Sequence, residues 1–413
     1  MDTLQENRYL NRVLAFNEEI SNNTFETGLN NNDLIIGNSG CGKTGSYVIP
    51  NIQQIDSSLL VTDTKGQLSR RFKDMLIKKG YEVYTIDLVN PQKSYGFNPL
   101  AAIRRHPDGT YYDQDILTVA EILTPKMDQT EPIWDLSARS YMAFLIAYCL
   151  GAMKRSQHNM RSIIELNEKY CMKDGQLYFL EWLNAHPYSL ATRKFHQIES
   201  NRTADKMHAS ILGFVTIALE PFCIRDYEKI FLAKETVDLR NLGRKKCVLF
   251  LNVSDTDRTQ DHIINAIYAQ ALNLLCYEAD QQEDGRLQVP VRIIMDDFAA
   301  NAVIPNFDKI ISIVRSRDIY ISMIIQSLSQ LESMYSTAEA NTIINNCDHI
   351  LFFGSQDLKT AELISTRTQV SPEKVAAMPR DKMYLIRSGE KGRMVDKIVP
   401  YSTVTDHVKH ESA

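Results

Sequence analysis

The sequence predicts an α/β fold in which a mostly parallel, buried sheet is interrupted by an all-helical domain. Short β-rich apolar runs alternate with helical stretches at both ends of the 413-residue chain, as in βαβ units. Between residues 113 and 235 the apolar residues instead follow helical spacing, and no convincing strand appears. A glycine-rich loop directly after the first strand-like run places a phosphate-binding turn at the edge of the sheet.

The chain divides into four segments along this pattern. Residues 1–32 are polar and lack a secretory signal. Residues 33–112 form the first part of a nucleotide-binding domain, residues 113–235 form the all-α domain, and residues 236–413 complete the nucleotide-binding domain. The strand-like runs are Leu34–Ile36, Ser58–Thr62, Tyr81–Ile86, Cys247–Val253, Val291–Asp296, Ile319–Ile325 and His349–Gly354.

The remaining elements follow from helical periodicity and turn residues. A stretch from Lys382 to Val399 carries a turn at Ser388–Gly392 between two apolar arms, which predicts a hairpin at the sheet edge. The apolar run Tyr141–Met153 is too short to span a membrane, so we expect a buried core helix there. The predicted helices of the insertion are Ile116–Leu123, Ser137–Met153, Met160–Lys169 and Thr203–Leu219.

Composition excludes few classes of function. The formal net charge of -5 argues against a surface covered in nucleic acid, although a local basic channel is compatible with an acidic total. The seven cysteines show no C-x-x-C spacing, so we expect reduced thiols rather than a metal site. Together with the absence of an export signal, this favours a cytoplasmic protein.

The most specific motif is a complete G-x-x-x-x-G-K-[ST] phosphate loop. Glycines allow backbone N–H groups to surround a triphosphate, Lys43 reaches its outer phosphates, and the Thr44 hydroxyl binds Mg2+. Cys41 is most simply a small loop residue. The sequence therefore predicts ATP and Mg2+ as cofactors. The predicted nucleotide-binding residues are Gly37, Asn38, Ser39, Gly40, Cys41, Gly42, Lys43, Thr44 and Gly45.

Two acidic residues follow the apolar strand that begins at Val291. We expect Asp296 to hold Mg2+, with Thr44 as the second metal-binding residue. Asp297 stands where a carboxylate can polarise the water that attacks the phosphate. The alternative is a strand that simply ends in solvated acids, but the phosphate loop elsewhere in the chain favours the catalytic interpretation.

A neutral amide ends the next strand. Gln326 falls at the carboxyl edge of the sheet, where ligands of open α/β sheets bind, so it is a candidate to orient water or sense the γ-phosphate. The alternative is a polar cap on the helix that follows.

An arginine pair ends the predicted helix Phe307–Arg317. Residues two apart do not share a helix face, so at most one of Arg315 and Arg317 reaches a neighbouring subunit. Arg315 lies farther from the apolar stripe of this helix, and we predict that it acts in trans on the transferring phosphoryl group. The alternative is a solvated or structurally paired arginine.

Further stretches make the chain resemble a known family. Together with the phosphate loop, they are similar to the coupling ATPases of bacterial conjugation and type IV secretion, the TraG/TraD kind. The similarity spans residues 33–398. The stretches are Val48–Asn51, Val61–Leu68, Tyr95–Leu100, Trp134–Arg139, Met295–Ala299, Gln326-Ser327 and Gln330-Leu331.

This resemblance implies a RecA-like P-loop core interrupted by an all-α domain and assembled as a homo-hexamer. It implies that ATP hydrolysis passes DNA, or a relaxase bound to DNA, to the proteins of a secretion channel at the inner face of the bacterial membrane. It assigns Lys43 to phosphate, Thr44 and Asp296 to Mg2+, Asp297 to the catalytic carboxylate, Gln326 to the sensor and Arg315 to the trans-acting finger. By the same analogy, the all-α domain meets the transferred substrate.

Two departures from the family pattern leave alternatives open. Asp297 stands where Glu is usual, so hydrolysis could be slower, and family members usually begin with membrane-spanning helices that this sequence lacks. We therefore expect either a truncated chain or a membrane anchor supplied by another protein. A nucleotide-gated recruitment platform with little hydrolysis and another type of hexameric DNA translocase are the alternative functions.

Overall fold

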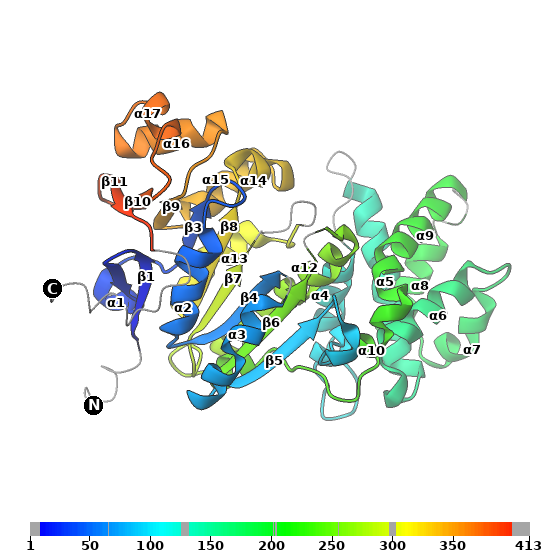
Figure 1. Cartoon of the computed structure of the whole chain (residues 1–413). Coiled ribbons are helices and arrows are strands. Elements are labelled where there is room, and N and C mark those ends of the chain that lie inside the picture. The colour runs from blue at the N-terminus through cyan, green and yellow to red at the C-terminus, as the bar shows by residue number, and fades with distance from the viewer. Residues whose placement is uncertain are drawn as a thin grey trace.

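A nine-stranded sheet forms the centre of the computed structural model, which describes residues 9–64, 66–124, 132–200, 202, 205–254, 256–296 and 303–398 (Figure 1). The strand order is β11-β10-β9-β3-β8-β7-β4-β6-β5, and the seven strands from β9 to β5 are parallel. The predicted α/β class with a mostly parallel sheet is confirmed. The strands are β3 (Asp33–Ile36), β4 (Ser58–Thr64), β5 (Glu82–Asp87), β6 (Cys247–Val253), β7 (Val291–Met295), β8 (Ile319–Ile325), β9 (His349–Phe352), β10 (Lys382–Arg387) and β11 (Arg393–Asp396).

Two hydrophobic cores cover the two faces of this sheet. Side chains alternate between them along each strand, so that Leu34 and Ile36 join one core while Ile35 joins the other. The core around Ile35 lies under α2 (Ile49–Gln53) and α3 (Gln67–Lys78). The opposite core is covered by α12 (Asp261–Asp280), α13 (Phe307–Ile313), α14 (Leu328–Met334), α15 (Thr337–Asn345), α16 (Leu358–Thr368) and α17 (Pro372–Ala376).

The part of the chain between β5 and β6 folds as helices in all its described elements. Its centre is α5 (Pro132–Ala152), in which residues 141–150 are all buried, as expected for a core helix. Phe144 on α5 packs against Tyr170, Phe179 and Phe195 from three other helices. The others are α4 (Asp113–Leu123), α6 (Met160–Cys171), α7 (Leu177–Ala185), α8 (Leu190–Glu199), α9 (Asp205–Leu219), α10 (Glu228–Phe231) and α11 (Asn241–Arg244).

Helices α7 and α8 were not among the predicted elements. They span nine and ten residues, which is shorter than the window over which helical periodicity becomes clear. Their packing against the long central helix α5 supplies the stabilisation that a short isolated helix lacks.

The polar N-terminal segment contains a small structured unit that the sequence did not predict. Strands β1 (Asn11–Ala15) and β2 (Glu18–Ser21) pair as a hairpin, and the short helix α1 (Thr24–Thr27) follows. Leu14 and Ala15 are buried in the same core as α2. Asn51 of α2 bonds both the N–H and the C=O of Val13, which ties the hairpin to the helix behind the phosphate loop.

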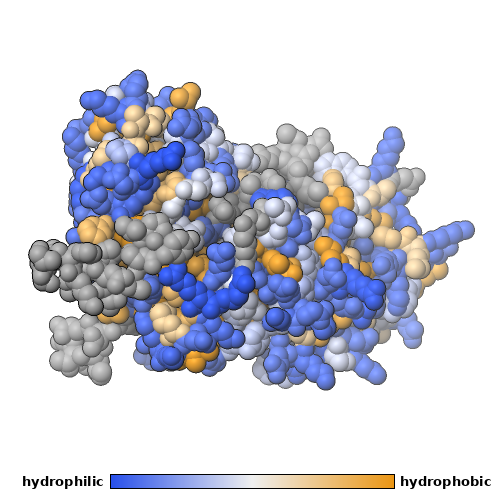
Figure 2. Space-filling view, viewed as in Figure 1, coloured by the Kyte–Doolittle hydropathy of each residue, from blue (hydrophilic) through white to orange (hydrophobic). Residues whose placement is uncertain are grey.

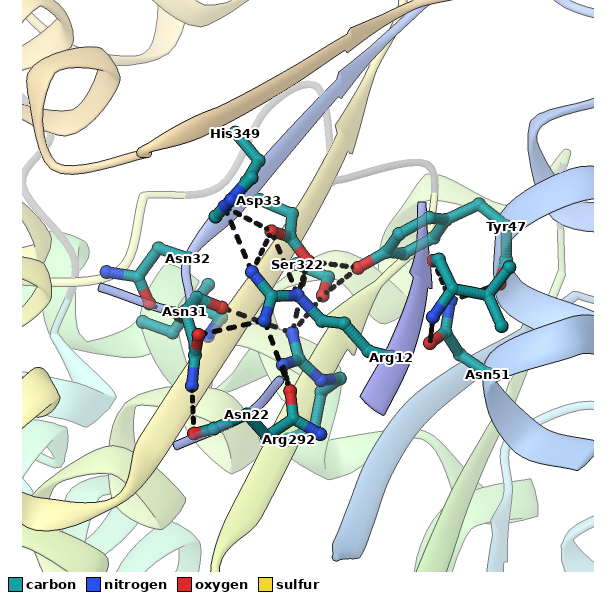
Figure 3. Close-up of polar contacts among 12 residues, drawn as sticks. Arg12, Asn22, Asn31, Asn32, Asp33, Tyr47, Asn51, Arg292, Ser322 and His349 are labelled. Carbon is teal, nitrogen blue, oxygen red and sulfur yellow. Dashed lines mark hydrogen bonds and ion pairs between the residues drawn. The ribbon is translucent and has the colours of Figure 1, made fainter. Parts of the chain in front are cut away.

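A buried polar cluster joins this hairpin to the amino ends of the central strands (Figure 3). The guanidinium of Arg12 contacts Asp33 of β3 at 3.0 Å, and Arg292 of β7 approaches the same carboxylate at 3.3 Å. His349 of β9 and Tyr47 also contact Asp33. Burial alone would raise the pKa of Asp33, but the surrounding cations and hydrogen bonds outweigh burial and hold this pKa far below its usual range.

Polar and charged residues dominate the face of the molecule drawn in Figure 2, and hydrophobic residues appear there in small separate groups. Among the described helices, none is by itself both long and apolar enough to cross a membrane. Only a bent pair, Lys206–Cys223 with Arg225–Phe231, meets that criterion of length and composition, with a 59° angle between its parts.

Candidate functional site

The phosphate loop begins at the carboxyl end of β3 and is held on both sides by the neighbouring strands. The N–H of Gly37 donates to the carbonyl oxygen of Ile325 at the end of β8 (3.1 Å), and the N–H of Asn38 donates to that of Gly354 after β9 (2.9 Å). Gly40 and Gly42 adopt φ angles of 76° and 92°, which side chains of L-residues rarely accept. Glycine is therefore required where the loop turns around its centre.

Several backbone N–H groups of the loop remain available to a ligand. Within the described part of the chain, no acceptor is found for the N–H groups of Ser39, Gly40 and Gly42. Successive unpaired N–H groups in such a loop form a concave site for an anion. The ammonium of Lys43 lies in the same loop, where it donates to the carbonyl oxygens of Gly37 (2.5 Å) and Asn38 (3.1 Å).

The helix behind the loop begins with a widened turn. Residues Thr44–Val48 form a π-helical turn, in which the N–H of Ile49 bonds the carbonyl oxygen of Thr44. Pro50 explains this turn because it has no N–H to continue the normal ladder. Helix α2 then continues into the core, where Ile49 and Ile52 are buried.

Thr44 and Asp296 meet across the sheet. The hydroxyl of Thr44 donates to Oδ2 of Asp296 at 2.7 Å, and Asp296 is 7% exposed at the end of β7. A hydroxyl and a carboxylate are the oxygen ligands that Mg2+ accepts alongside phosphate and water. The predicted metal-binding residues therefore lie together, and their donor atoms fit the ion. Asp297, the predicted catalytic carboxylate, lies outside the described residues.

Gln326 follows β8 directly and is exposed at the carboxyl edge of the sheet. It lies next to the start of the phosphate loop, because the preceding residue, Ile325, accepts the hydrogen bond from Gly37. The Gln326 N–H donates to the side chain of Gln330, so the backbone of Gln326 is held by the following helix. Ser327, rather than Gln326, caps that helix.

Arg315 lies at the opposite edge of the sheet. The predicted helix Phe307–Arg317 is too long, since α13 ends at Ile313 and residues 314–317 form a 3-10 turn that stops at Asp318, whose φ is 59°. Arg317 pairs with Asp280 (2.8 Å), whereas exposed Arg315 donates only to the carbonyl oxygen of Gly28 in the described structure (2.8 Å). Because this turn precedes β8 and the phosphate loop follows the adjacent parallel strand β3, Arg315 cannot reach the loop of its own chain.

Comparison with known proteins agrees with this geometry. Residues 4–370 match the family model described as type IV secretory system conjugative DNA transfer. The chain belongs to this family. The predicted family is thus confirmed, and with it a role in conjugative DNA transfer. A search of curated proteins found no match.

Solved structures support the fold of this family member. It is similar to the plasmid coupling protein TrwB in complex with the ATP analogue ADPNP, with a TM-score of 0.69 at 14% identity over 91% of this chain and 86% of the other. The TrwB complex with ADP and Mg2+ has a TM-score of 0.68, at 14% identity over 90% and 86%. VirB4 of Thermoanaerobacter pseudethanolicus has a TM-score of 0.55, at 13% identity over 90% of each chain. The α/β core fold expected from the sequence is confirmed.

Asp63, in the family-like stretch Val61–Leu68, stabilises the start of helix α3. The carboxylate of Asp63 accepts the N–H groups of Leu68 (2.8 Å) and Ser69 (2.7 Å), so it caps the first turn of α3. Gly66, with a φ of 63°, allows the tight turn between strand and helix. Lys65 lies outside the described residues.

The sequence did not point to Lys397, which lies beside the phosphate loop. Its ammonium donates to the carbonyl oxygens of Cys41 in the phosphate loop (3.3 Å) and of Phe353 (3.1 Å). No local signal indicated this contact, because Lys397 follows the edge hairpin and is 356 positions from Cys41.

The all-α part of this family member contains a large cavity of about 760 Å³. Two guanidinium groups and several aromatic rings face it. The residues that line it include Arg105, Arg155, Tyr111, His158, Trp182 and Tyr188.

Proposed function

We propose that this chain hydrolyses ATP to drive the transfer of a relaxase bound to DNA into the channel of a conjugative type IV secretion system. The contact between Thr44 and Asp296, beside a phosphate loop with available N–H groups, carries this proposal. It joins a metal-binding hydroxyl and carboxylate to an anion site, which is the minimum arrangement for phosphoryl transfer from ATP.

Each residue then has one task. The loop N–H groups and Lys43 bind and orient the phosphates, and Thr44 with Asp296 would hold Mg2+. The bound ion would neutralise charge that develops on the phosphate oxygens. We assign Asp297 to the attacking water and Gln326, at the carboxyl edge, to sensing the γ-phosphate.

Assembly as a homo-hexamer completes the proposed site. Arg315 and the phosphate loop occupy opposite edges of the same sheet, so an arginine finger at this position requires a neighbouring subunit. An arginine supplied in trans would stabilise the charge of the transferring phosphoryl group only in the assembled ring. Hydrolysis would thereby depend on assembly at the inner face of the membrane.

The all-α domain, residues 113–235, is the proposed contact for the transferred substrate. Its cavity presents Arg155 beside aromatic rings, the segment just before this domain adds Arg105, and the acidic residue Asp113 at this cavity is already paired with Arg193 at 2.6 Å. Guanidinium groups and rings together suit a phosphate backbone and its bases. The nucleotide-binding domain consists of residues 33–112 and 236–413 on either side.

The test is steady-state ATP hydrolysis against protein concentration, with and without single-stranded DNA, for the wild type and Arg315→Ala. We expect activity to rise more steeply than linearly with concentration, to increase with DNA and to disappear in the variant. Arg317→Ala is the matched control, because Arg317 is already paired within its own chain. Activity that is flat with concentration and indifferent to both DNA and Arg315 would contradict the proposal.

A nucleotide-gated recruitment platform is the second candidate. The observation that favours it is Asp297, which is one methylene shorter than the glutamate usual at this position and so reaches less far toward a water molecule. A platform would bind ATP and substrate but show no stimulated turnover. Asp297→Glu would then raise the hydrolysis rate, whereas in a fully active motor it would leave the rate close to that of the wild type.

A further inference from the structure

The chain returns to the phosphate loop after the edge hairpin. β11 ends at Asp396, whose carbonyl oxygen accepts the N–H of Phe16 from the N-terminal hairpin (3.1 Å). Two residues later, the carbonyl oxygen of Ile398 accepts the hydroxyl of Ser46, on the turn behind the loop (2.8 Å). These contacts hold Lys397, which lies between Asp396 and Ile398, against the site.

Lys397 binds backbone oxygens instead of a carboxylate. Its ammonium bridges the carbonyl oxygens of Cys41 and Phe353 and lies 5.2 Å from the centre of the Phe353 ring. Within the described structure no carboxylate lies within ion-pair distance of it. Burial lowers the pKa of Lys397, so the protein incurs a cost in keeping this charge here.

The geometry of the peptide bond links this contact to the nucleotide site. A trans peptide is planar, and its C=O and N–H point in opposite directions. All described peptides are trans. When Lys397 holds the carbonyl oxygen of Cys41, the N–H of Gly42 must point away from Lys397. That N–H is one of the groups for which no protein acceptor is found in the described structure.

The second contact of Lys397, with the carbonyl oxygen of Phe353, joins the Cys41–Gly42 peptide to the segment after β9. The N–H of Phe353 donates to the carbonyl oxygen of Ile36 (2.7 Å), and the N–H of Asn38 donates to the carbonyl oxygen of Gly354 (2.9 Å). The segment after β9 is therefore bonded to the residues on both sides of Gly37, where the phosphate loop begins. By bonding Phe353 and Cys41 together, Lys397 connects the tip of the loop to the end of β9. Without it, rotation of the Cys41–Gly42 peptide would meet less resistance.

We propose that Lys397 is a positioning residue for nucleotide binding, which aims the Gly42 N–H at a phosphate of the bound nucleotide by holding the Cys41 carbonyl. The inference rests on the proposed nucleotide site and adds to that site a contact from the residue that follows the edge hairpin of β10 and β11. Lys397 acts before chemistry, on the geometry of the binding loop. Its removal should therefore weaken nucleotide binding and leave the hydrolytic step intact.

The experiment measures binding of a fluorescent ADP analogue with Mg2+, together with KM and kcat for ATP, in Lys397→Ala, Lys397→Met and Lys397→Arg. The Met variant keeps the apolar stem, in case the Ala variant folds poorly. We expect the Ala and Met variants to bind nucleotide about tenfold more weakly, with KM raised to match and kcat within about twofold, as for the loss of one charge-assisted hydrogen bond. Lys397→Arg should recover most of the affinity.

Lys382→Ala is the matched control, because Lys382 lies on the same hairpin and pairs with Asp396 on the surface. It should leave affinity unchanged. Equal affinity in the wild type and both apolar variants would overturn the inference while the proposed function stands. So would a loss that Arg does not restore, or one that Lys382→Ala shares. If the wild type and Lys43→Ala bind nucleotide equally, the proposed site itself fails, and the inference fails with it.

Discussion

Thr44 and Asp296 are 252 positions apart in the sequence, and one hydrogen bond joins them at the phosphate loop. Each takes its position from a different element, Thr44 from the π-helical turn and Asp296 from the end of β7. Lys43 lies beside them with only 7% of its surface exposed. At this scale, function depends on how accurately these charges and oxygens are placed, because a displacement of about 1 Å can lower a rate by about 100-fold.

The first residue-scale prediction concerns Lys43. Lys43→Ala should lower ATP hydrolysis by about 100-fold or more, because a positive charge aimed at the phosphates is lost from a largely buried position. Phosphate release under saturating ATP measures the effect. Lys73→Ala, on the exposed face of α3, should retain wild-type activity. Equal losses in both variants would show that the effect is not specific to the loop.

The second concerns the metal. Asp296→Asn keeps the shape of the side chain and removes its charge, so the ion would be held by weaker ligands. We expect the Mg2+ concentration for half-maximal hydrolysis to rise about tenfold or more. The measurement is a Mg2+ titration at fixed ATP. An unchanged titration would exclude Asp296 as a ligand.

At the scale of elements, a buried arginine helps to hold the N-terminal hairpin against the sheet. Arg12 contacts Asp33 of β3, Asn31 and His349 of β9, and is 2% exposed (Figure 3). Two buried arginines share the charge of Asp33, and burial lowers the pKa of His349, which favours its neutral form. The hairpin is therefore part of the folded core rather than an appended tail.

Removing the Arg12 side chain should weaken the attachment of the hairpin and lower the stability of the protein. Arg12→Ala leaves several buried polar groups without their partner, and we expect a loss of about 3–5 kcal/mol in the free energy of unfolding. Urea unfolding followed by circular dichroism measures it. Arg161→Ala, which removes a surface ion pair of α6, should cost less than about 1 kcal/mol. Similar losses in the two variants would mean that the hairpin adds little to stability.

Helix α12 meets the helical insertion at His262. The ring packs against Phe222, its Nε2 is out of contact with solvent, and burial lowers the pKa of His262 to about 4. The folded state therefore disfavours the protonated ring at this junction.

Stability should accordingly fall in acid. Between about pH 6.5 and pH 4 the unfolded chain binds a proton at His262 that the folded chain does not, so the free energy of unfolding decreases as pH falls, by up to about 3 kcal/mol from this group. His262→Gln should show a correspondingly shallower decrease. Unfolding curves measured at several pH values compare the two proteins. Parallel pH dependence in both would contradict this assignment.

At the scale of the whole molecule, the two edges of the sheet carry different halves of the proposed site. The phosphate loop and Gln326 lie at the carboxyl edge, whereas Arg315 lies at the amino edge. A single chain cannot bring these edges together, and a ring of identical chains can, because each interface is head-to-tail.

Mixing two inactive variants tests this arrangement. Lys43→Ala retains Arg315, and Arg315→Ala retains an intact phosphate loop. In an equal mixture, about a quarter of the interfaces would combine an intact loop with an intact arginine, so activity should recover to about a quarter of that of the wild type. Hydrolysis by each variant alone and by the mixture, at equal total protein, gives the comparison. No recovery on mixing would exclude Arg315 as a trans-acting residue.

Local sequence was sufficient for the fold class, the phosphate loop, the acidic end of β7 and the four helices α4, α5, α6 and α9 of the insertion. These features are encoded by periodicity or by residues adjacent in the chain, and apolar alternation with turn residues reports them directly. It overextended the helix before Arg315, because nothing in the apolar stripe signals the left-handed turn at Asp318. The helices α7 and α8 were not predicted because they are too short for helical periodicity to be clear.

The contacts between distant segments required the three-dimensional arrangement. Buried parallel strands are apolar on both faces, so their sequences do not reveal that β3 lies between β8 and β9. That order alone brings Arg12 to Asp33 and His349, and the edge hairpin to the phosphate loop through Lys397. These contacts depend on which strands are neighbours, and the order of the strands is a property of the folded sheet rather than of any one segment.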